Sequence, residues 1–152
     1  MSDKTCKRVV LIVKASKVGE RALDEALKIM DQEKCEKLSL LFVVDEEFFK
    51  GAGASYLHTD ELFRESMEEI GRAILDKMEM LIKKKAGDIN YERIVLHGKT
   101  AEEILKFVKS NQIDILVLPR DRRGPIERFL IGGDITPFIK EIEKYTRVVV
   151  VE

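Results

Sequence analysis

Short, continuous runs of β-branched and other apolar residues constrain the fold of this chain more than any other feature. The clearest are Arg8–Val13, Leu38–Val44 and Arg147–Val151. An apolar run without alternation is typical of a strand that is covered on both faces, as the strands of parallel sheets are. Two further strands are predicted at Tyr91–Leu96 and Ile113–Leu118.

Segments with a helical repeat of apolar residues lie between these strands. Ser16 is placed to cap a first helix, whose predicted inner face is Ala22, Leu23, Ala26, Leu27 and Met30. Thr59 is a cap for a long helix that runs to about Ala86. Its apolar positions step by three and four: Phe63, Met67, Ile70, Ile74, Met78 and Leu81.

Two helices are predicted in the second half of the chain. Thr100 and Glu103 have the spacing of a capping box, in which each side chain satisfies a backbone N–H of the first turn. The residues that follow, Ile104, Leu105, Phe107 and Val108, are expected to point inward. A last helix is predicted from about Asp134 to Tyr145.

Strands that alternate with helices predict an α/β fold with a parallel sheet, formed by residues 1–152 as a single domain. In such sheets the ligand site lies beyond the carboxyl ends of the strands, where the strand order reverses. The loops that carry any chemistry are therefore expected at 14–19, 45–58, 97–100 and 119–133.

The charge balance excludes several classes of partner. The chain has 27 basic and 28 acidic residues among 152, which gives a net charge of −1. This balance argues against the broad basic surface that drives nucleic-acid binding. The apolar runs are about five residues long, whereas a membrane span needs roughly 20. We expect a cytoplasmic protein that binds no nucleic acid and no membrane.

The cysteines and histidines give no catalytic or metal site. Cys6 and Cys35 lack the spacing of metal ligands, and two reduced, structural thiols are favoured over a single disulfide. His97 is either a general base or a partly exposed histidine at a strand end, and the second reading is favoured because no nucleophile accompanies it. His58 is equally unsupported. No catalytic residue and no metal site is predicted.

The first loop lacks the common phosphate-binding patterns. The segment after the first strand has neither a P-loop nor a dinucleotide fingerprint, since Gly19 stands alone. The loop after the fourth strand is more specific. Ile126–Gly132 resembles the end of the universal stress protein motif, which is Gly, two residues, Gly, nine residues, Gly-Ser/Thr. The resemblance extends to Glu20–Leu23, Leu40–Asp45, His97–Gly98, Ala101–Leu105 and Asn111–Val117.

The resemblance implies a fold and a site. The family fold, which is similar to that of the adenine nucleotide alpha hydrolases, is an open parallel sheet of five strands in the order 3-2-1-4-5 with helices on both faces. Many members bind ATP at the ends of strands one and four. The adenine-recognising acid corresponds here to Lys14, a backbone contact to Val43, the glycine after strand three to Gly98, and the four motif positions to Pro119, Arg122, Gly132 and Gly133.

Most of these positions depart from the motif, in which only Gly132 is retained. Lys14 cannot accept a hydrogen bond from an adenine amino group. Pro119 lacks an N–H donor, and Arg122 brings a long side chain where the motif has glycine. Gly133 lacks a hydroxyl, and the carboxylate of Asp134 competes with a bound anion. The sequence therefore predicts that ATP does not bind in the usual family mode and that no cofactor is required.

An alternative is a site built from side chains. Lys14, Arg120, Arg122 and Arg123 either converge and bind a small anionic ligand, such as a nucleotide or another phosphorylated compound, or form a solvated turn paired with neighbouring acids. The segment 45–58, with its paired phenylalanines and glycines, is either a lid or a packing element. A weak nucleotide hydrolase is a further alternative, without a convincing set of Mg²⁺ ligands.

The last strand predicts an association surface. In the strand order 3-2-1-4-5, Val148, Val149, Val150 and Val151 lie at a sheet edge, and an uncovered apolar edge strand pairs readily with another chain. In the family this edge pairs with a second subunit, so the resemblance implies a homodimer through residues 147–151. The leading interpretation is a dimeric binding or regulatory module of stress response without enzymatic turnover.

Overall fold

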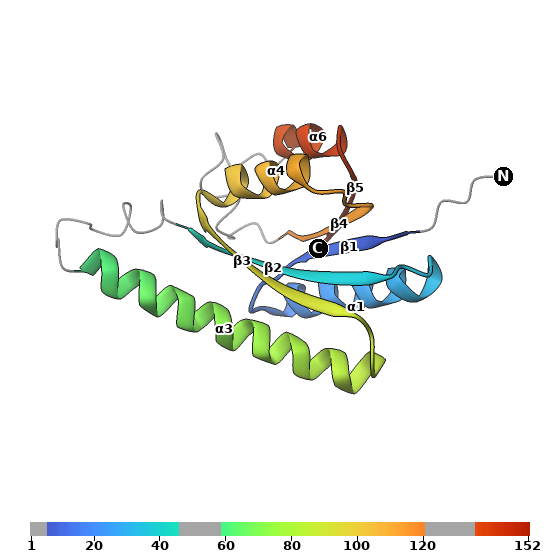
Figure 1. Cartoon of the computed structure of the whole chain (residues 1–152), viewed down its shortest axis with the longest axis horizontal. Coiled ribbons are helices and arrows are strands. Elements are labelled where there is room, and N and C mark those ends of the chain that lie inside the picture. The colour runs from blue at the N-terminus through green and yellow to red at the C-terminus, as the bar shows by residue number, and fades with distance from the viewer. Residues whose placement is uncertain (1–5, 46–58, 121–135) are drawn as a thin grey trace.

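The computed structural model describes residues 6–45, 59–120 and 136–152. In these ranges the chain forms one parallel sheet in the order β3-β2-β1-β4-β5 (Figure 1). The predicted α/β class and strand order are confirmed. The strands are Arg8–Ile12 (β1), Lys37–Asp45 (β2), Tyr91–Gly98 (β3), Ile115–Pro119 (β4) and Arg147–Val151 (β5).

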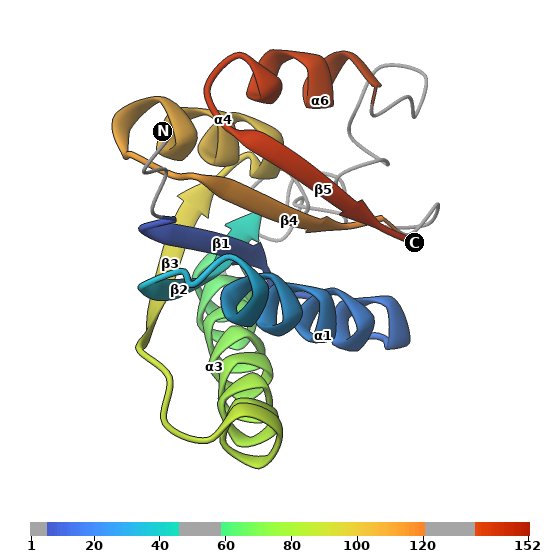
Figure 2. The same ribbon diagram turned by 90° about the vertical axis from the view of Figure 1, so that its right-hand side faces the viewer.

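Helices cover both faces of the sheet. They are Lys17–Gln32 (α1), Thr59–Ala86 (α3), Thr100–Ser110 (α4) and Thr136–Glu143 (α6). Figure 2 shows α1 and α3 on one face, and α4 and α6 on the other. Each pair of helices closes its own apolar core, because alternate residues of every strand point to opposite faces.

The central strand is the best buried element. Val9, Val10 and Leu11 have no exposed surface, because β1 has a neighbouring strand on each side and helices above and below. This confirms the interpretation of its continuous apolar run. The hydroxyl of Ser16 accepts a hydrogen bond from the N–H of Gly19 at 3.1 Å, so the predicted cap of α1 is also confirmed.

The inner face of α3 differs from its predicted stripe. Ile70 is half exposed, whereas Leu75 and Ile82 are fully buried. The cause lies at Gly71, where a Cβ would come within 2.5 Å of the Phe42 ring. Because the helix crosses β2 at this glycine, the buried stripe follows Gly71 and leaves Ile70 facing outward.

The predicted capping box of α4 is wrong. The helix begins at Thr100 itself, and its N-cap, Lys99, makes no side-chain cap. The backbone N–H of Thr100 instead donates to Oδ2 of Asp45 at 3.1 Å, and the Thr100 hydroxyl donates to the same oxygen. A buried carboxylate at the end of β2 therefore caps α4, a role that pairwise spacing within the helix cannot reveal.

The expectation of two reduced thiols is also wrong. Cys6 and Cys35 form a disulfide, with their Cα atoms 4.4 Å apart. The pairing joins the start of β1 to the turn before β2. These strands are parallel neighbours with Arg8 opposite Lys37, so their entry segments are held side by side.

Candidate functional site

The carboxyl ends of the strands bring together several of the residues that the family motif selects. β1 pairs with both β2 and β4, and the strand order reverses between β1 and β4. Lys14 follows β1, and Pro119 ends β4, so both border the crevice in which open α/β sheets bind ligands. Val43 is half-buried two residues before the end of β2. The predicted positions Arg122, Arg123, Gly132, Gly133 and Asp134, like His58 and the segment 46–58, lie outside the described residues.

The loop after β1 is compact. The carbonyl oxygen of Lys14 accepts the N–H of Ser16 at 3.1 Å, and a Cβ on Gly19 would come within 1.9 Å of that same oxygen. Only glycine fits at this approach. Gly19 therefore fixes the backbone of Lys14 at the crevice, a role that sequence reasoning missed because it tested Gly19 only against phosphate-binding fingerprints.

Two carboxylates lie where β3 passes into α4. Gly98 adopts a φ of +145°, and a Cβ there would come within 2.8 Å of the Glu103 side chain. Asp45, opposite Gly98 in the sheet, occupies the first backbone N–H of α4. The N-terminus of a helix ordinarily attracts anions. Here the protein supplies the negative charge itself.

The end of β4 is tied to the last strand. Pro119 is buried and lies opposite Val151. The N–H of Arg120 donates to the carbonyl of Val151 at 2.7 Å, and its guanidinium pairs with Glu152 at 3.3 Å. Arg21 on α1 donates to the Glu152 carbonyl oxygen at 3.3 Å. Arg120 thus pairs with an acid that neither interpretation of the basic cluster included, and Arg21 is a further cation at this edge.

His97 lies near the end of β3 on the face covered by α3. Its side chain is 40% exposed, and Nε2 lies 2.7 Å from Oε1 of Glu68. This is the partly exposed strand-end histidine that the sequence favours. The nearby partner is a carboxylate of a packing helix, so this contact joins α3 to β3 and presents no nucleophile to a general base.

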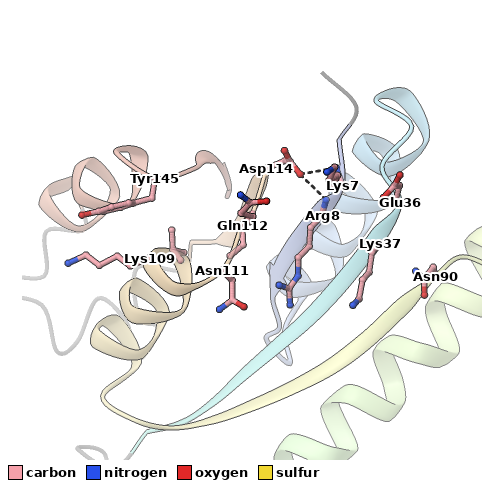
Figure 3. A pocket seen from close by; sticks show the side chains of 12 residues that line it. Lys7, Arg8, Glu36, Lys37, Asn90, Lys109, Asn111, Gln112, Asp114 and Tyr145 are labelled. Carbon is pink, nitrogen blue, oxygen red and sulfur yellow. Dashed lines mark hydrogen bonds between the residues drawn. The ribbon is translucent and has the colours of Figure 1, made fainter. Parts of the chain in front are cut away.

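A polar cavity of about 590 Å³ lies at the opposite edge of the sheet, among the starts of the strands (Figure 3). Asp114 accepts the N–H groups of Lys7 and Arg8 at 2.8 and 2.9 Å. The Arg8 guanidinium donates to Ser39 and Glu92, both at 2.9 Å. These contacts link the entries of the four adjacent strands β3, β2, β1 and β4.

The partners of the Glu92 carboxylate favour its charged form. Burial by itself raises the pKa of Glu92, but hydrogen bonds from Lys37 and Ser39 and the charge of Arg8 outweigh it, so the pKa is lowered. Arg8 and Lys37 share this carboxylate, so these two cations of the cavity wall are paired within the protein. We therefore assign a structural role to the side of the sheet at which the strands begin. The candidate ligand site is placed at the side where the strands end.

The described part of the chain gives no sign of metal binding or of a membrane span. Among these residues no three histidine, cysteine or carboxylate side chains gather into a group that could hold a metal ion. None of the helices within the described ranges combines the length and the apolar character needed to cross a bilayer.

Comparison with known proteins agrees with the geometry. The strand order and the crevice between β1 and β4 define an open, doubly wound α/β protein. The sequence matches the model of the Universal stress protein family over residues 5–136. The chain therefore belongs to the universal stress protein family. It is 28% identical, over 134 residues, to universal stress protein MJ0531 of Methanocaldococcus jannaschii, covering 88% of this chain and 76% of that one.

Solved structures share the fold at low sequence identity. Universal stress protein UspA from Lactobacillus plantarum aligns with a TM-score of 0.73 at 14% identity, over 99% of this chain and 100% of that one. A universal stress protein in complex with cAMP aligns at 0.60 and 18% identity, over 98% of each chain. An Arabidopsis thaliana family protein with AMP bound aligns at 0.58 and 19% identity, over 96% of this chain and 92% of that one.

Proposed function

We propose that this protein is a regulatory binding module of stress response that acts in the cytoplasm without enzymatic turnover and does not bind ATP in the usual family mode. The observation that carries the proposal is the pair of carboxylates at the start of α4. Asp45 caps the helix, and the Glu103 side chain lies against Gly98. A phosphate at this point would meet negative charge at a helix N-terminus whose first backbone N–H is already occupied.

Two residues at the crevice support the same conclusion. Lys14 is half-buried directly after β1, and its ammonium offers donors only, so it cannot accept from an adenine amino group. Pro119 is buried at the end of β4 and has no N–H to donate. Lys14 therefore lacks the hydrogen-bond acceptor, and Pro119 the backbone donor, that the family resemblance places at these positions.

Titration calorimetry with Mg-ATP tests this proposal. We expect no saturable heat for the wild-type chain at 1:1 stoichiometry. Restoring the acid with Lys14→Asp, alone and together with Glu103→Gln, should raise the affinity for ATP. Lys17→Asp, an equal charge change at an exposed residue nearby, is the matched control. Stoichiometric ATP or AMP that co-purifies with the wild-type protein would contradict the proposal.

A second candidate function is the binding of a nucleotide or another phosphorylated ligand through cationic side chains. It is supported by the structural relatives that bind cAMP and AMP, and by Lys14, Arg21 and Arg120 at this edge. If it is correct, a fluorescent AMP analogue binds the wild type, and the double variant Lys14→Ala, Arg122→Ala loses that binding. Unchanged affinity in the double variant would exclude it.

We further propose a homodimer formed through β5. This strand pairs only with β4 among the described strands, and Val148, Val149, Val150 and Val151 are half-buried. Pairing with the same strand of a second chain would satisfy the outer backbone groups and cover the valines. Val150 belongs to neither apolar core, so Val150→Lys tests the edge with little damage to the fold. Light scattering should show twice the chain mass of 17.5 kDa for the wild type and a shift toward the single mass for the variant.

A further inference from the structure

A second cavity, of about 730 Å³, lies beside the disulfide, away from the proposed ligand site. Its walls come from the end of α1, the turn before β2 and the end of α3. Figure 1 shows the ends of α1 and α3 on the same side of the molecule, the side on which β1 begins. Cys35 lines this cavity, whereas Cys6 does not.

The two sulfur atoms differ in accessibility. Cys6 is 6% exposed and packs within the core beneath α1, whereas Cys35 is half-buried. Thiol–disulfide exchange proceeds by attack of a thiolate on one sulfur, with the other sulfur as leaving group. Because Cys35 lines the cavity and Cys6 is buried, an attacking thiol reaches Cys35, and Cys6 is then the leaving sulfur.

Hydrogen bonds hold the two cysteines together independently of the covalent bond. The N–H of Cys35 donates to the Met30 carbonyl at 3.0 Å, and the N–H of Glu36 donates to the Cys6 carbonyl at 3.1 Å. When the disulfide opens, these contacts keep the released Cys6 beside Cys35. The geometry therefore favours a reaction that reverses within the folded protein.

The charged side chains around the cavity balance. Lys28 and Lys34 line it and form no ion pair with a described residue, whereas Lys85 is paired with Asp24. Asp31 and Glu36 also line the cavity, so two acids stand against the two remaining lysines. The cavity therefore admits small thiols of either charge.

We propose that Cys35 is a thiol–disulfide exchange site for small thiols. The thiolate forms a new S–S bond with Cys35 as the Cys35–Cys6 bond breaks, and the Cys6 thiolate takes up a proton from water. A second thiolate attacks the sulfur of the first thiol in the mixed disulfide and releases the Cys35 thiolate. The protein disulfide gains two electrons, and two thiols become one small disulfide. The reverse sequence, with that small disulfide as oxidant, restores the bond between Cys6 and Cys35.

Peptide mass spectrometry of the intact wild-type chain tests which sulfur reacts. The folded protein is treated with 2-mercaptoethanesulfonate, the exchange is stopped with acid within seconds, and free thiols are then alkylated with N-ethylmaleimide in denaturant. We expect the mixed disulfide on Cys35 and the alkyl group on Cys6. A mixed disulfide on Cys6 overturns the proposal. So does a reduction rate that rises only with urea at concentrations that unfold the chain, because exchange would then require global unfolding.

A rate comparison tests access through the cavity. The reduction rates with 2-mercaptoethanesulfonate and with the cation cysteamine are each divided by the rate of the same thiol with bis(2-hydroxyethyl) disulfide. We expect the two normalised rates of the wild type to be similar, because the cavity charges balance. The variant Lys28→Gln, Lys34→Gln leaves two acids and should lower the rate of the anionic thiol relative to the cationic one at low salt, and less at 1 M salt. Lys17→Gln, outside the cavity, should leave the ratio unchanged. No change in the double variant overturns the cavity as the route of attack.

Discussion

The side of the sheet at which the strands begin, here called the amino edge, differs in construction from the side at which they end, the carboxyl edge. At the amino edge, a disulfide, the carboxylate of Asp114 and the Arg8–Glu92 pair cross-link strands that are far apart in sequence. At the carboxyl edge, the close approach of the Lys14 carbonyl to Gly19, the contact of the Glu103 side chain with Gly98 and a buried aspartate shape the loops. We call the cross-links of the amino edge clasps. The carboxyl edge consists instead of tightly packed turns.

This difference shows how one fold separates stability from binding. Clasps at the amino edge fix the strand entries without limiting the loops at the opposite edge, where ligands bind in open α/β sheets. In this chain the turns at the carboxyl edge also carry the acidic groups Asp45 and Glu103, and the proposed function rests on these groups opposing a phosphate.

Removing the disulfide should give the largest effect on the amino edge. The bond spans 29 residues, and a cross-link of this length stabilises the folded state by about 3–4 kcal/mol through the entropy of the unfolded chain. The double variant Cys6→Ser, Cys35→Ser should lower the free energy of unfolding in urea by that amount. If the variant and the oxidised wild type unfold at the same urea concentration, the amino edge does not depend on this clasp.

Gly19→Ala should give the largest effect on the carboxyl edge. The new Cβ would overlap the Lys14 carbonyl oxygen, and relief requires a shift of the backbone, which we expect to cost about 3 kcal/mol. Gly87→Ala is the control. A Cβ at Gly87 meets no atom within 4 Å, and only its φ of +68° is unfavourable, so a cost of about 1 kcal/mol is expected. Equal losses in urea unfolding would contradict the close approach.

Two substitutions of Asp45 distinguish its role as a hydrogen-bond acceptor at the start of α4 from the effect of its negative charge. Asp45→Ala removes the acceptor of two hydrogen bonds at a buried position and should cost about 2–3 kcal/mol. Asp45→Asn retains an acceptor oxygen and should cost about 1 kcal/mol. Thermal unfolding of the two variants measures the difference. Equal destabilisation would mean that the negative charge, and not the acceptor, holds the start of α4.

The Glu92 clasp should give the smallest effect, which depends on pH. Because the pKa of Glu92 is lowered from its ordinary value of 4.5 in the folded protein, its contribution is complete above that value and is lost as the pH falls through the folded pKa. Glu92→Gln should cost about 1–2 kcal/mol at pH 7, and the difference from the wild type should shrink at pH 3.

Glu141→Gln is the matched control for this measurement, since Glu141 pairs with Lys144 at the surface. We expect no measurable change in its urea unfolding at pH 7. A Glu92→Gln curve that stays parallel to the wild type between pH 3 and pH 7 would show that this carboxylate does not stabilise the amino edge.

The strands and helices can be predicted from local sequence patterns. The five strands and the described helices follow from the spacing of apolar residues, and the Ser16 cap follows from the residue before α1. These signals are local, because a strand or helix repeats its burial every two or 3.6 residues. The strand order came from the family resemblance and not from periodicity.

Only the tertiary structure decided which distant residues meet. The Asp45 cap of α4 joins residues 55 positions apart, the disulfide spans 29, and Arg120 meets Glu152 across 32. Likewise Gly71 sets the face of α3 only because Phe42 lies beneath it. Such contacts depend on how strands are placed side by side. A local pattern therefore predicts that a residue is buried, but not which partner makes its burial favourable.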